Sequence, residues 1–269
     1  MKYQQIVHGT FVSRPNRFIA QVKIESTVHT VHVKNTGRCR ELLIPGAKVL
    51  LEYHPDARTL GRKTEYSLVG VYKAGDNGLP ARLVNMDSQA PNQAAKEWLE
   101  RGGLPESGEM PERAGLPDAE NQGERRCPQN IRSEVTYGQS RFDLAFEIGG
   151  KPAFMEVKGV TLEKQGIAMF PDAPTERGVK HLQELADAAE HGFQAYILFV
   201  IQMKGVYEFR PNWETHEAFA RALKEAAEKG VHVLAYDCLV GEDGFQIDQP
   251  VPLSYGTDIQ PEMPGTFQR

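Results

Sequence analysis

The sequence predicts an α/β protein of two domains, a small β-barrel followed by a mixed β-sheet flanked by helices. Short β segments separated by turn residues fill the first ninety positions, and amphipathic helices alternate with apolar strands after residue 131. A segment rich in Pro, Gly and Glu lies between the two patterns. The chain has 269 residues, of which 40% are hydrophobic and 25% charged, and this excludes a disordered chain or a disulfide scaffold.

Residues 1–88 form the predicted barrel. Segments 18–24, 27–34, 48–54 and 66–73 contain β-branched residues in partial alternation, and Asn, Pro and Gly residues separate them. Four or five strands in this length indicate an OB-like Greek-key barrel, a fold that often binds single-stranded nucleic acid.

The two ends of the chain carry opposite charge. Residues 1–73 contain twelve Lys and Arg against five Asp and Glu, whereas residues 131–269 have a net charge of −8 and the whole chain one of −5. A basic module attracts phosphates without regard to sequence. A merely solvated basic surface explains the composition equally well, so charge alone leaves both interpretations open.

The candidate contacts to a nucleic-acid backbone are cationic or polar side chains in loops and at one helix start. In the first domain they are Arg14, Arg17, Asn35, Thr36, Arg38 and Arg40. In the second they are Arg177, Lys180 and His181, at the opening of a predicted helix where the helix dipole also attracts anions. These three residues could contact phosphates or support the active site from behind, and a solvated helix face explains them equally well.

Residues 89–130 connect the domains. A short helix over 92–101 is followed by an insertion with five Gly, four Pro and five Glu between positions 102 and 130. Such a composition buries too little apolar surface to offset the entropy of ordering, so we expect a flexible surface segment. We also expect a flexible tail over 256–269.

Residues 131–255 form the predicted second domain, in the order three strands, helix, strand, helix, strand. The second and third strands are joined across Gly149 and Gly150, which is a hairpin signal. Thr175 is the expected N-cap of a helix that stops at Gly192, and the second helix spans about 213–229. The last two strands are the apolar runs 195–201 and 231–237.

Three residues of this domain suit phosphodiester hydrolysis. Glu156 and Lys158 share one face of a strand, and Asp143 lies on the preceding strand of the same hairpin. Asp143, Glu156 and the Val157 carbonyl could hold Mg²⁺ or Mn²⁺, and Lys158 could orient the attacking water. This is the arrangement of the PD-(D/E)xK nuclease-like fold, although a Glu-x-Lys triplet also occurs by chance in a chain of this size.

Several longer stretches resemble the sugar fermentation stimulation protein A (SfsA) family. They are Arg14-Pro-Asn-Arg-Phe and the segments 33–47, 132–144, 155–162 and 170–185. The resemblance implies an OB-like domain, a PD-(D/E)xK nuclease-like domain and DNA binding without strong sequence preference. By motif, Asp143, Glu156 and Lys158 match the nuclease positions, and Glu134 is a candidate fourth acidic member.

The sequence therefore favours a DNA-binding protein with a metal-dependent nuclease domain. The alternative is a non-catalytic DNA-binding protein on the same scaffold, which the resemblance implies would be a regulator of sugar metabolism, notably of maltose. A metabolic enzyme or sugar-binding protein is disfavoured, because the chain lacks a GxGxxG, P-loop or serine-elbow motif. We expect a cytoplasmic protein with reduced cysteines, no membrane partner, and DNA rather than RNA as its first ligand; a homodimer stays open.

Overall fold

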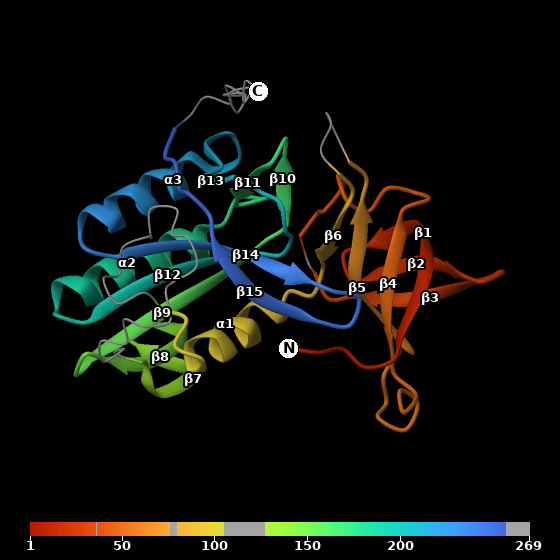
Figure 1. Ribbon diagram of the computed structural model, residues 1–269, viewed down its shortest axis with the longest axis horizontal. Coiled ribbons are helices and arrows are strands. Elements are labelled where there is room, and N and C mark those ends of the chain that lie inside the picture. Colours follow the sequence, from red (N-terminus) through yellow and green to blue (C-terminus); the bar gives the residue numbers. More distant parts are fainter. Residues whose placement is uncertain (36, 76–79, 105–126, 257–269) are drawn as a thin grey trace, which may run out of the picture.

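The computed structural model describes residues 1–35, 37–75, 80–104 and 127–256. Figure 1 shows a β-barrel built from the first part of the chain beside a larger layered unit built from the rest. Thr36, most of the predicted insertion and nearly all of the predicted tail lie outside the described residues. The α/β architecture predicted from the sequence is confirmed.

The N-terminal unit is a barrel of five strands, β1 to β5, with the strand order of an OB-fold, and a sixth strand, β6, pairs with β5 outside the closed ring. Its sheet runs β3-β2-β1-β4-β5-β6, and a parallel pairing of β3 with β5 closes it. The strands are β1 (Ile6–Asn16), β2 (Ile19–Ile24), β3 (Thr27–Val33), β4 (Lys48–Tyr53), β5 (Tyr66–Lys73) and β6 (Arg82–Asn85).

The sequence pattern located β2 to β5 and missed β1 and β6. The pairing of β1 with β2 contains two register shifts, so its side chains do not alternate regularly between core and solvent. Pro15 near its end also argues against a strand when only propensity is considered. β6 has only four residues, too few for a period to be recognised.

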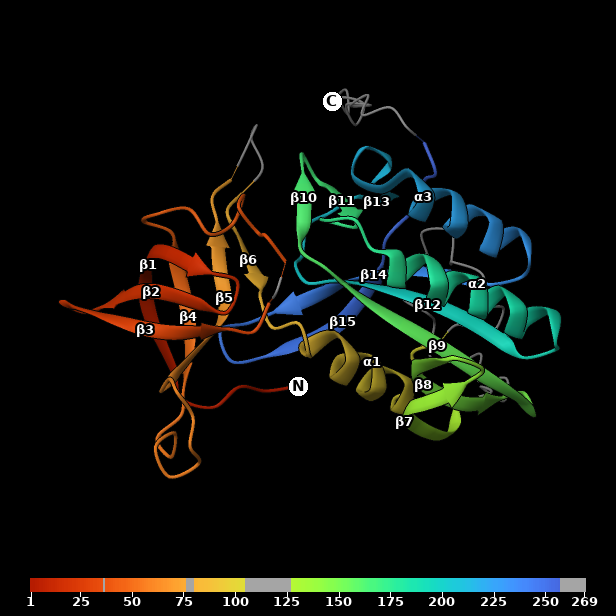
Figure 2. The same ribbon diagram turned by 180° about the vertical axis from the view of Figure 1, so that it is seen from behind.

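The second unit is a six-stranded mixed sheet between helices, in the order β15-β14-β12-β9-β8-β7. Its strands are β7 (Gln129–Tyr137), β8 (Ser140–Ile148), β9 (Lys151–Val160), β12 (Gln194–Ile201), β14 (His232–Val240) and β15 (Phe245–Pro250). Helix α1 (Ala90–Glu100) covers one face, while α2 (Glu176–Glu190) and α3 (Trp213–Glu228) cover the other, as Figures 1 and 2 show.

Local sequence signals explain the two long helices. The Thr175 side chain accepts a hydrogen bond from the Gly178 amide at 3.0 Å, and Asn212 caps α3 in the same way through the Thr215 amide. Both helices bury an apolar stripe against the sheet and each other. The predicted helix starts at 175 and 213 are therefore confirmed to within a residue.

A small third sheet, not expected from the sequence, lies between these units. It consists of β10 (Leu162–Lys164), β11 (Ile167–Phe170) and β13 (Glu208–Pro211), in the order β10-β11-β13. Two of the three strands have four residues and the other has three, which is too short for a periodic signal.

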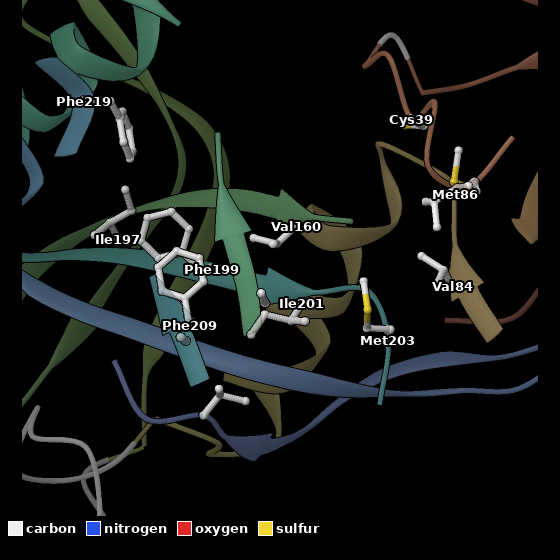
Figure 3. Close-up of a cluster of buried hydrophobic side chains, with 14 of the residues drawn as sticks. Cys39, Val84, Met86, Val160, Ile197, Phe199, Ile201, Met203, Phe209 and Phe219 are labelled. Carbon is white, nitrogen blue, oxygen red and sulfur yellow. The ribbon is translucent and has the colours of Figure 1, made fainter. Parts of the chain in front are cut away.

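The barrel and the larger sheet share one hydrophobic core. Figure 3 shows Cys39, Val84 and Met86 of the first unit near Val160 and Met203 of the second, and all five are buried in one cluster. Polar contacts reinforce this junction. The buried Gln202 amide donates to the Asn85 side chain at 2.9 Å and to the Asp87 carbonyl at 3.1 Å, and the Lys73 ammonium contacts the buried carboxylate of Glu163.

The three cysteines, Cys39, Cys127 and Cys238, all lie in the described part of the chain and form no disulfide there. Among the described helices, none combines the length and the hydropathy that crossing a membrane requires.

Candidate active site and nucleic-acid interface

The β8–β9 hairpin brings Asp143 and Glu156 to neighbouring strands. Gly149 and Gly150 form its turn, and Gly150 has a φ of +74°, a conformation that favours glycine. The register pairs Leu144 with Met155, so the next positions along the two strands are Asp143 and Glu156. The predicted convergence of these two carboxylates follows from this register.

Asp143 lies where the regular pattern of β8 changes. Phe142 and Ala145 pack in one core and Leu144 in the other, so the side-chain alternation shifts at Asp143. Its carboxylate accepts a hydrogen bond from the Val157 amide at 2.8 Å and another from the Asn92 side chain of α1, also at 2.8 Å. Asp143 thus points along the sheet toward β9 and α1.

Glu156 is buried and held by two neighbours. Its Oε1 atom lies 2.5 Å from Nζ of Lys158 and also contacts Nδ1 of His181 on α2. Glu156 is only 2% exposed and His181 4%. The β9 strand and the first turns of α2 therefore fix the orientation of this carboxylate.

The two carboxyl groups differ in their pKa shifts. Burial raises the pKa of Asp143 above its ordinary value, and the negative charge of Glu156 raises it further. Burial also acts to raise the pKa of Glu156, but the hydrogen bond from His181 and the charge of Lys158 outweigh it, so this pKa is lowered. Glu156 is the ionised partner, and Asp143 is the group that resists ionisation.

One carboxylate oxygen of this site is buried without a partner. Among the described residues, Oε2 of Glu156 makes no hydrogen bond, which is costly for a buried charged atom unless a ligand completes it. The Val157 amide faces Asp143, and because the amide and carbonyl of one strand residue face the same side, the Val157 carbonyl faces the same space.

The chemical type of these oxygens suits a hard divalent cation, but they are too few to fill its coordination sphere. Two carboxylates and a backbone carbonyl are the donors that Mg²⁺, Mn²⁺ and Ca²⁺ prefer. Within the described residues, no three His, Cys, Asp or Glu side chains gather closely enough to hold a metal by themselves. Water and a substrate phosphate would have to supply the remaining ligands, as is usual for Mg²⁺.

His181 lies at the centre of this site, buried against Glu156. Of the two roles that the sequence left open for it, a phosphate contact or a support for the site, this position fits the second. The Arg177 side chain donates from Nε to Nε2 of His181 at 3.2 Å. Because arginine is only a donor, Nε2 is the acceptor, and the ring proton on Nδ1 is donated to Glu156. The signal was present in the sequence, since His181 falls in the inward stripe of α2 with Leu182 and Leu185.

Two other predicted residues lie outside this cluster. Glu134 is placed by register opposite Asp143, but its side chain is 66% exposed and its carboxylate lies 3.5 Å from Arg141. Lys180 is exposed on α2 and lies 3.7 Å from Glu184. Asn92, by contrast, was not a sequence candidate, because only the tertiary packing of α1 places it against Asp143.

The predicted loop of the barrel is organised around Arg14. Its guanidinium donates to the carbonyls of Gly37 at 2.8 Å and Asn35 at 2.7 Å, and to those of Arg17 and Arg38. The Asn35 side chain accepts from the Gly37 amide at 2.8 Å. Arg14 and Asn35 therefore shape the loop, and their hydrogen-bonding groups are largely used within the protein.

The remaining arginines of this loop face solvent. Arg17, Arg38 and Arg40 are exposed and line a hollow of about 270 Å³. Gly37 closely approaches the Asp172 carboxylate of the loop before α2, so the loop abuts the start of the helix that carries Arg177 and His181. Thr36 lies outside the described residues.

Comparisons with known proteins agree over most of the chain. Residues 89–244 match the model of the sugar fermentation stimulation protein RE domain, and residues 12–79 that of the SfsA N-terminal OB domain. Relatives described as sugar fermentation stimulation protein homologs include one from Desulfitobacterium hafniense, 49% identical over 91% of this chain and 95% of its own. Another, from Alkaliphilus oremlandii, is 48% identical over 95% of this chain and 99% of its own length.

A solved structure has the same architecture. It is described as Pyrococcus furiosus SfsA in complex with Ca²⁺, and it aligns with a TM-score of 0.76 at 26% sequence identity. The alignment covers 94% of this chain and 98% of the other. Both units and their arrangement are therefore common to the two proteins.

Proposed function

The chain belongs to the sugar fermentation stimulation protein family, and from this premise we propose that it binds nucleic acid and hydrolyses phosphodiester bonds with Mg²⁺ or Mn²⁺. The observation that carries the proposal is the buried, unpartnered Oε2 of Glu156 beside Asp143 and Lys158. Lys158 and His181 already contact Oε1, so Oε2 is the oxygen of this carboxylate that is free to take a further ligand, and a nuclease uses a divalent cation at the scissile phosphate.

The residues of the site divide the chemical work. A bound divalent cation supplies Lewis acidity and lowers the pKa of water. Asp143 and Glu156 supply oxygens to hold it, and the Ca²⁺ in the Pyrococcus relative is a cation of the same ligand preference. The Lys158 ammonium, 2.5 Å from Glu156, can orient the attacking water and offset negative charge on the phosphate.

His181 acts on Glu156 rather than on substrate. By donating to Oε1 it fixes the carboxylate and leaves Oε2 as the free ligand atom. Arg177 in turn fixes the ring proton on Nδ1. The exposed Arg38 and Arg40 supply charge for a nucleic-acid backbone on the barrel side.

A second candidate is a non-catalytic nucleic-acid-binding regulator of sugar metabolism. It is favoured by the incomplete set of metal ligands among the described residues and by the engagement of Oε1 with Lys158 and His181. In that case the second domain serves as a binding platform, and the family description refers to a regulatory effect.

Cleavage assays separate the two candidates. Labelled duplex, single-stranded, flap and junction substrates of DNA and RNA would be incubated with Mg²⁺, Mn²⁺ or EDTA. We expect metal-dependent cleavage by the wild type and none by Asp143→Asn/Lys158→Met. Glu147→Gln, an exposed carboxylate change on the same strand as Asp143, is the matched control and should cleave normally. Binding without cleavage in every protein would favour the regulator.

A further inference from the structure

A basic groove lies on the barrel, outside the candidate active site and distinct from the hollow that Arg17, Arg38 and Arg40 line. It has a volume of about 580 Å³ and is bounded by the β1–β2 turn, the end of β3 and the β4–β5 loop. In OB-folds these two loops and the face of the second and third strands form the surface that binds oligonucleotides. The groove therefore occupies the position where this fold holds such ligands.

The groove has an exposed aromatic ring. Phe18 in the β1–β2 turn is 45% exposed, although a phenylalanine at a surface is more stable when covered. The Arg17 guanidinium lies 4.8 Å from the centre of the ring. The guanidinium lies over one face of the ring, so a base would stack on the exposed remainder of the ring and its phosphate would find a counter-charge at Arg17.

Charge on the groove matches a polyanion. Lys34, Arg62 and Lys63 line it, and none of the described lining residues is acidic. The Lys34 ammonium also lies 2.7 Å from Asp87, so the exposed Arg62 and Lys63 supply most of the available positive charge.

The groove continues in both directions. Asn16 lines both it and the hollow of Arg17, Arg38 and Arg40. At its other end, Gln89 is the N-cap of α1, whose N-terminus has no side-chain cap. Asn92, within one turn of Gln89, donates to Asp143. The first turn of α1 therefore links the groove, through Gln89, to the Asp143 carboxylate, through Asn92.

We propose that this groove binds a single strand of nucleic acid, with one base stacked on Phe18 and the backbone directed over the start of α1 toward Asp143. The proposal rests on the nucleic-acid binding in the proposed function and adds the form of the ligand and the place where it is held. Single-stranded DNA and single-stranded RNA share the required chemistry.

The test is fluorescence anisotropy with the full-length protein in EDTA, which removes any contribution from a metal or from cleavage. The probes are labelled oligo-dT and oligo-U of about 12 nucleotides and a hairpin duplex. We expect Phe18→Ala to weaken single-strand binding about tenfold and to leave duplex binding unchanged, and Phe18→Trp to bind as the wild type does. The tighter of the two single strands identifies the natural source.

Tyr207→Ala is the matched control, because Tyr207 is an aromatic residue of similar exposure, 49%, outside the groove. Its affinity for all probes should equal that of the wild type. Wild-type affinity of Phe18→Ala for both single strands would overturn the proposal, as would an equal loss for the duplex. The cleavage assay does not depend on this measurement. A result that rejects strand binding at the groove can therefore be told apart from one that rejects nuclease activity.

A crosslinking experiment on the wild type does not depend on any variant folding. Irradiation of bound oligonucleotide containing 5-iododeoxyuridine should couple it to the peptide that contains Phe18, as identified by mass spectrometry. Crosslinks confined to residues after α1, which ends at Glu100, would place the strand elsewhere and contradict the proposal.

Discussion

The barrel and the mixed sheet place their candidate functional side chains in opposite ways. On the barrel, Arg17, Arg38 and Arg40 are exposed and lie in loops. On the sheet, Glu156 and His181 are almost completely buried and contact each other. The barrel therefore presents separate charges to solvent, whereas the sheet holds a few buried groups in fixed positions through mutual hydrogen bonds.

This difference in burial predicts how strongly substitutions in each region should affect activity and binding. Exposed cations act on phosphates through screened, nearly additive terms, so each contributes modestly. Buried groups that share hydrogen bonds act as a unit, and the loss of one disables the others. We therefore expect large effects at the sheet and small, salt-dependent effects at the barrel.

The largest expected effect is that of Glu156→Gln. Gln keeps the size of the side chain but removes the anionic oxygen, so metal-dependent cleavage should fall at least about 10³-fold. Calorimetric titration should show that Mn²⁺ no longer binds at the site. Oligonucleotide affinity in EDTA should stay at the wild-type value, since the barrel is unchanged.

Glu147→Gln is again the control, and thermal unfolding should confirm that Glu156→Gln folds. Unaltered Mn²⁺ affinity in Glu156→Gln would contradict the assignment of Glu156 as a metal ligand. Lost oligonucleotide affinity would contradict the proposal that the barrel binds the oligonucleotide independently of this site.

The next effect concerns His181. His181→Leu removes the donor to Glu156, and we expect kcat to fall about 10- to 100-fold with KM unchanged, as for other residues that orient metal ligands. His181→Asn keeps a donor near the position of Nδ1 and should restore much of kcat. His191→Gln, at the exposed end of the same helix, is the control. A raised KM with unchanged kcat would instead favour the phosphate contact suggested by the sequence.

The raised pKa of Asp143 predicts that the stability of the fold depends on pH. An acid whose pKa is raised in the folded state favours folding when protonated, so its contribution is lost as pH rises from its ordinary value of 3.8 through the raised pKa. Without metal at neutral pH, Asp143→Asn should therefore raise the melting temperature by a few degrees. Below pH 3.8 the difference should vanish, because both proteins then carry a neutral side chain.

Calorimetric or fluorescence melting across pH 3 to 8 would measure this difference. Added Mn²⁺ should stabilise the wild type but not Asp143→Asn. An Asp143→Asn protein that is less stable than the wild type at neutral pH without metal would contradict the raised pKa.

The same contrast explains what the sequence could predict. Strand β12 and helices α2 and α3 carry long apolar patterns or caps, and these elements were located to within a residue or so. Asp143 and Glu156 were brought together by a hairpin, which is a local feature. Strands β10 and β13 have three and four residues and depend on tertiary packing, so no period revealed them.

The site was predictable to the same extent. The contact of His181 with Glu156 joins a helix to a strand 25 residues earlier, and that of Asn92 with Asp143 spans 51 residues. The inward stripe of α2 indicates that His181 is buried, but no local pattern identifies the partner of His181 or of Asn92. The role of Arg14 was hidden for a similar reason, since its partners are backbone carbonyls and carry no side-chain pattern.

The smallest effects, and the finest test of the comparison, lie within the barrel. Arg38→Ala and Arg40→Ala should each weaken binding to all sequences by a few-fold and reduce the slope of log K against log salt by about 0.7 to 0.9 per lost phosphate contact. Lys23→Gln, an exposed change on β2 outside both hollows, should leave the slope unchanged.

Arg14→Ala should behave differently although Arg14 lines the same hollow. Its guanidinium holds four backbone carbonyls of the loop, so its loss leaves these acceptors without their donor and lowers the melting temperature by several degrees. Arg38→Ala should melt as the wild type does, because its side chain is exposed. Thermal melting and salt titration of both variants decide the matter. If Arg14→Ala changed only the salt slope, this arginine would be a phosphate ligand, and the barrel would have no residue that organises its loop as His181 orients Glu156.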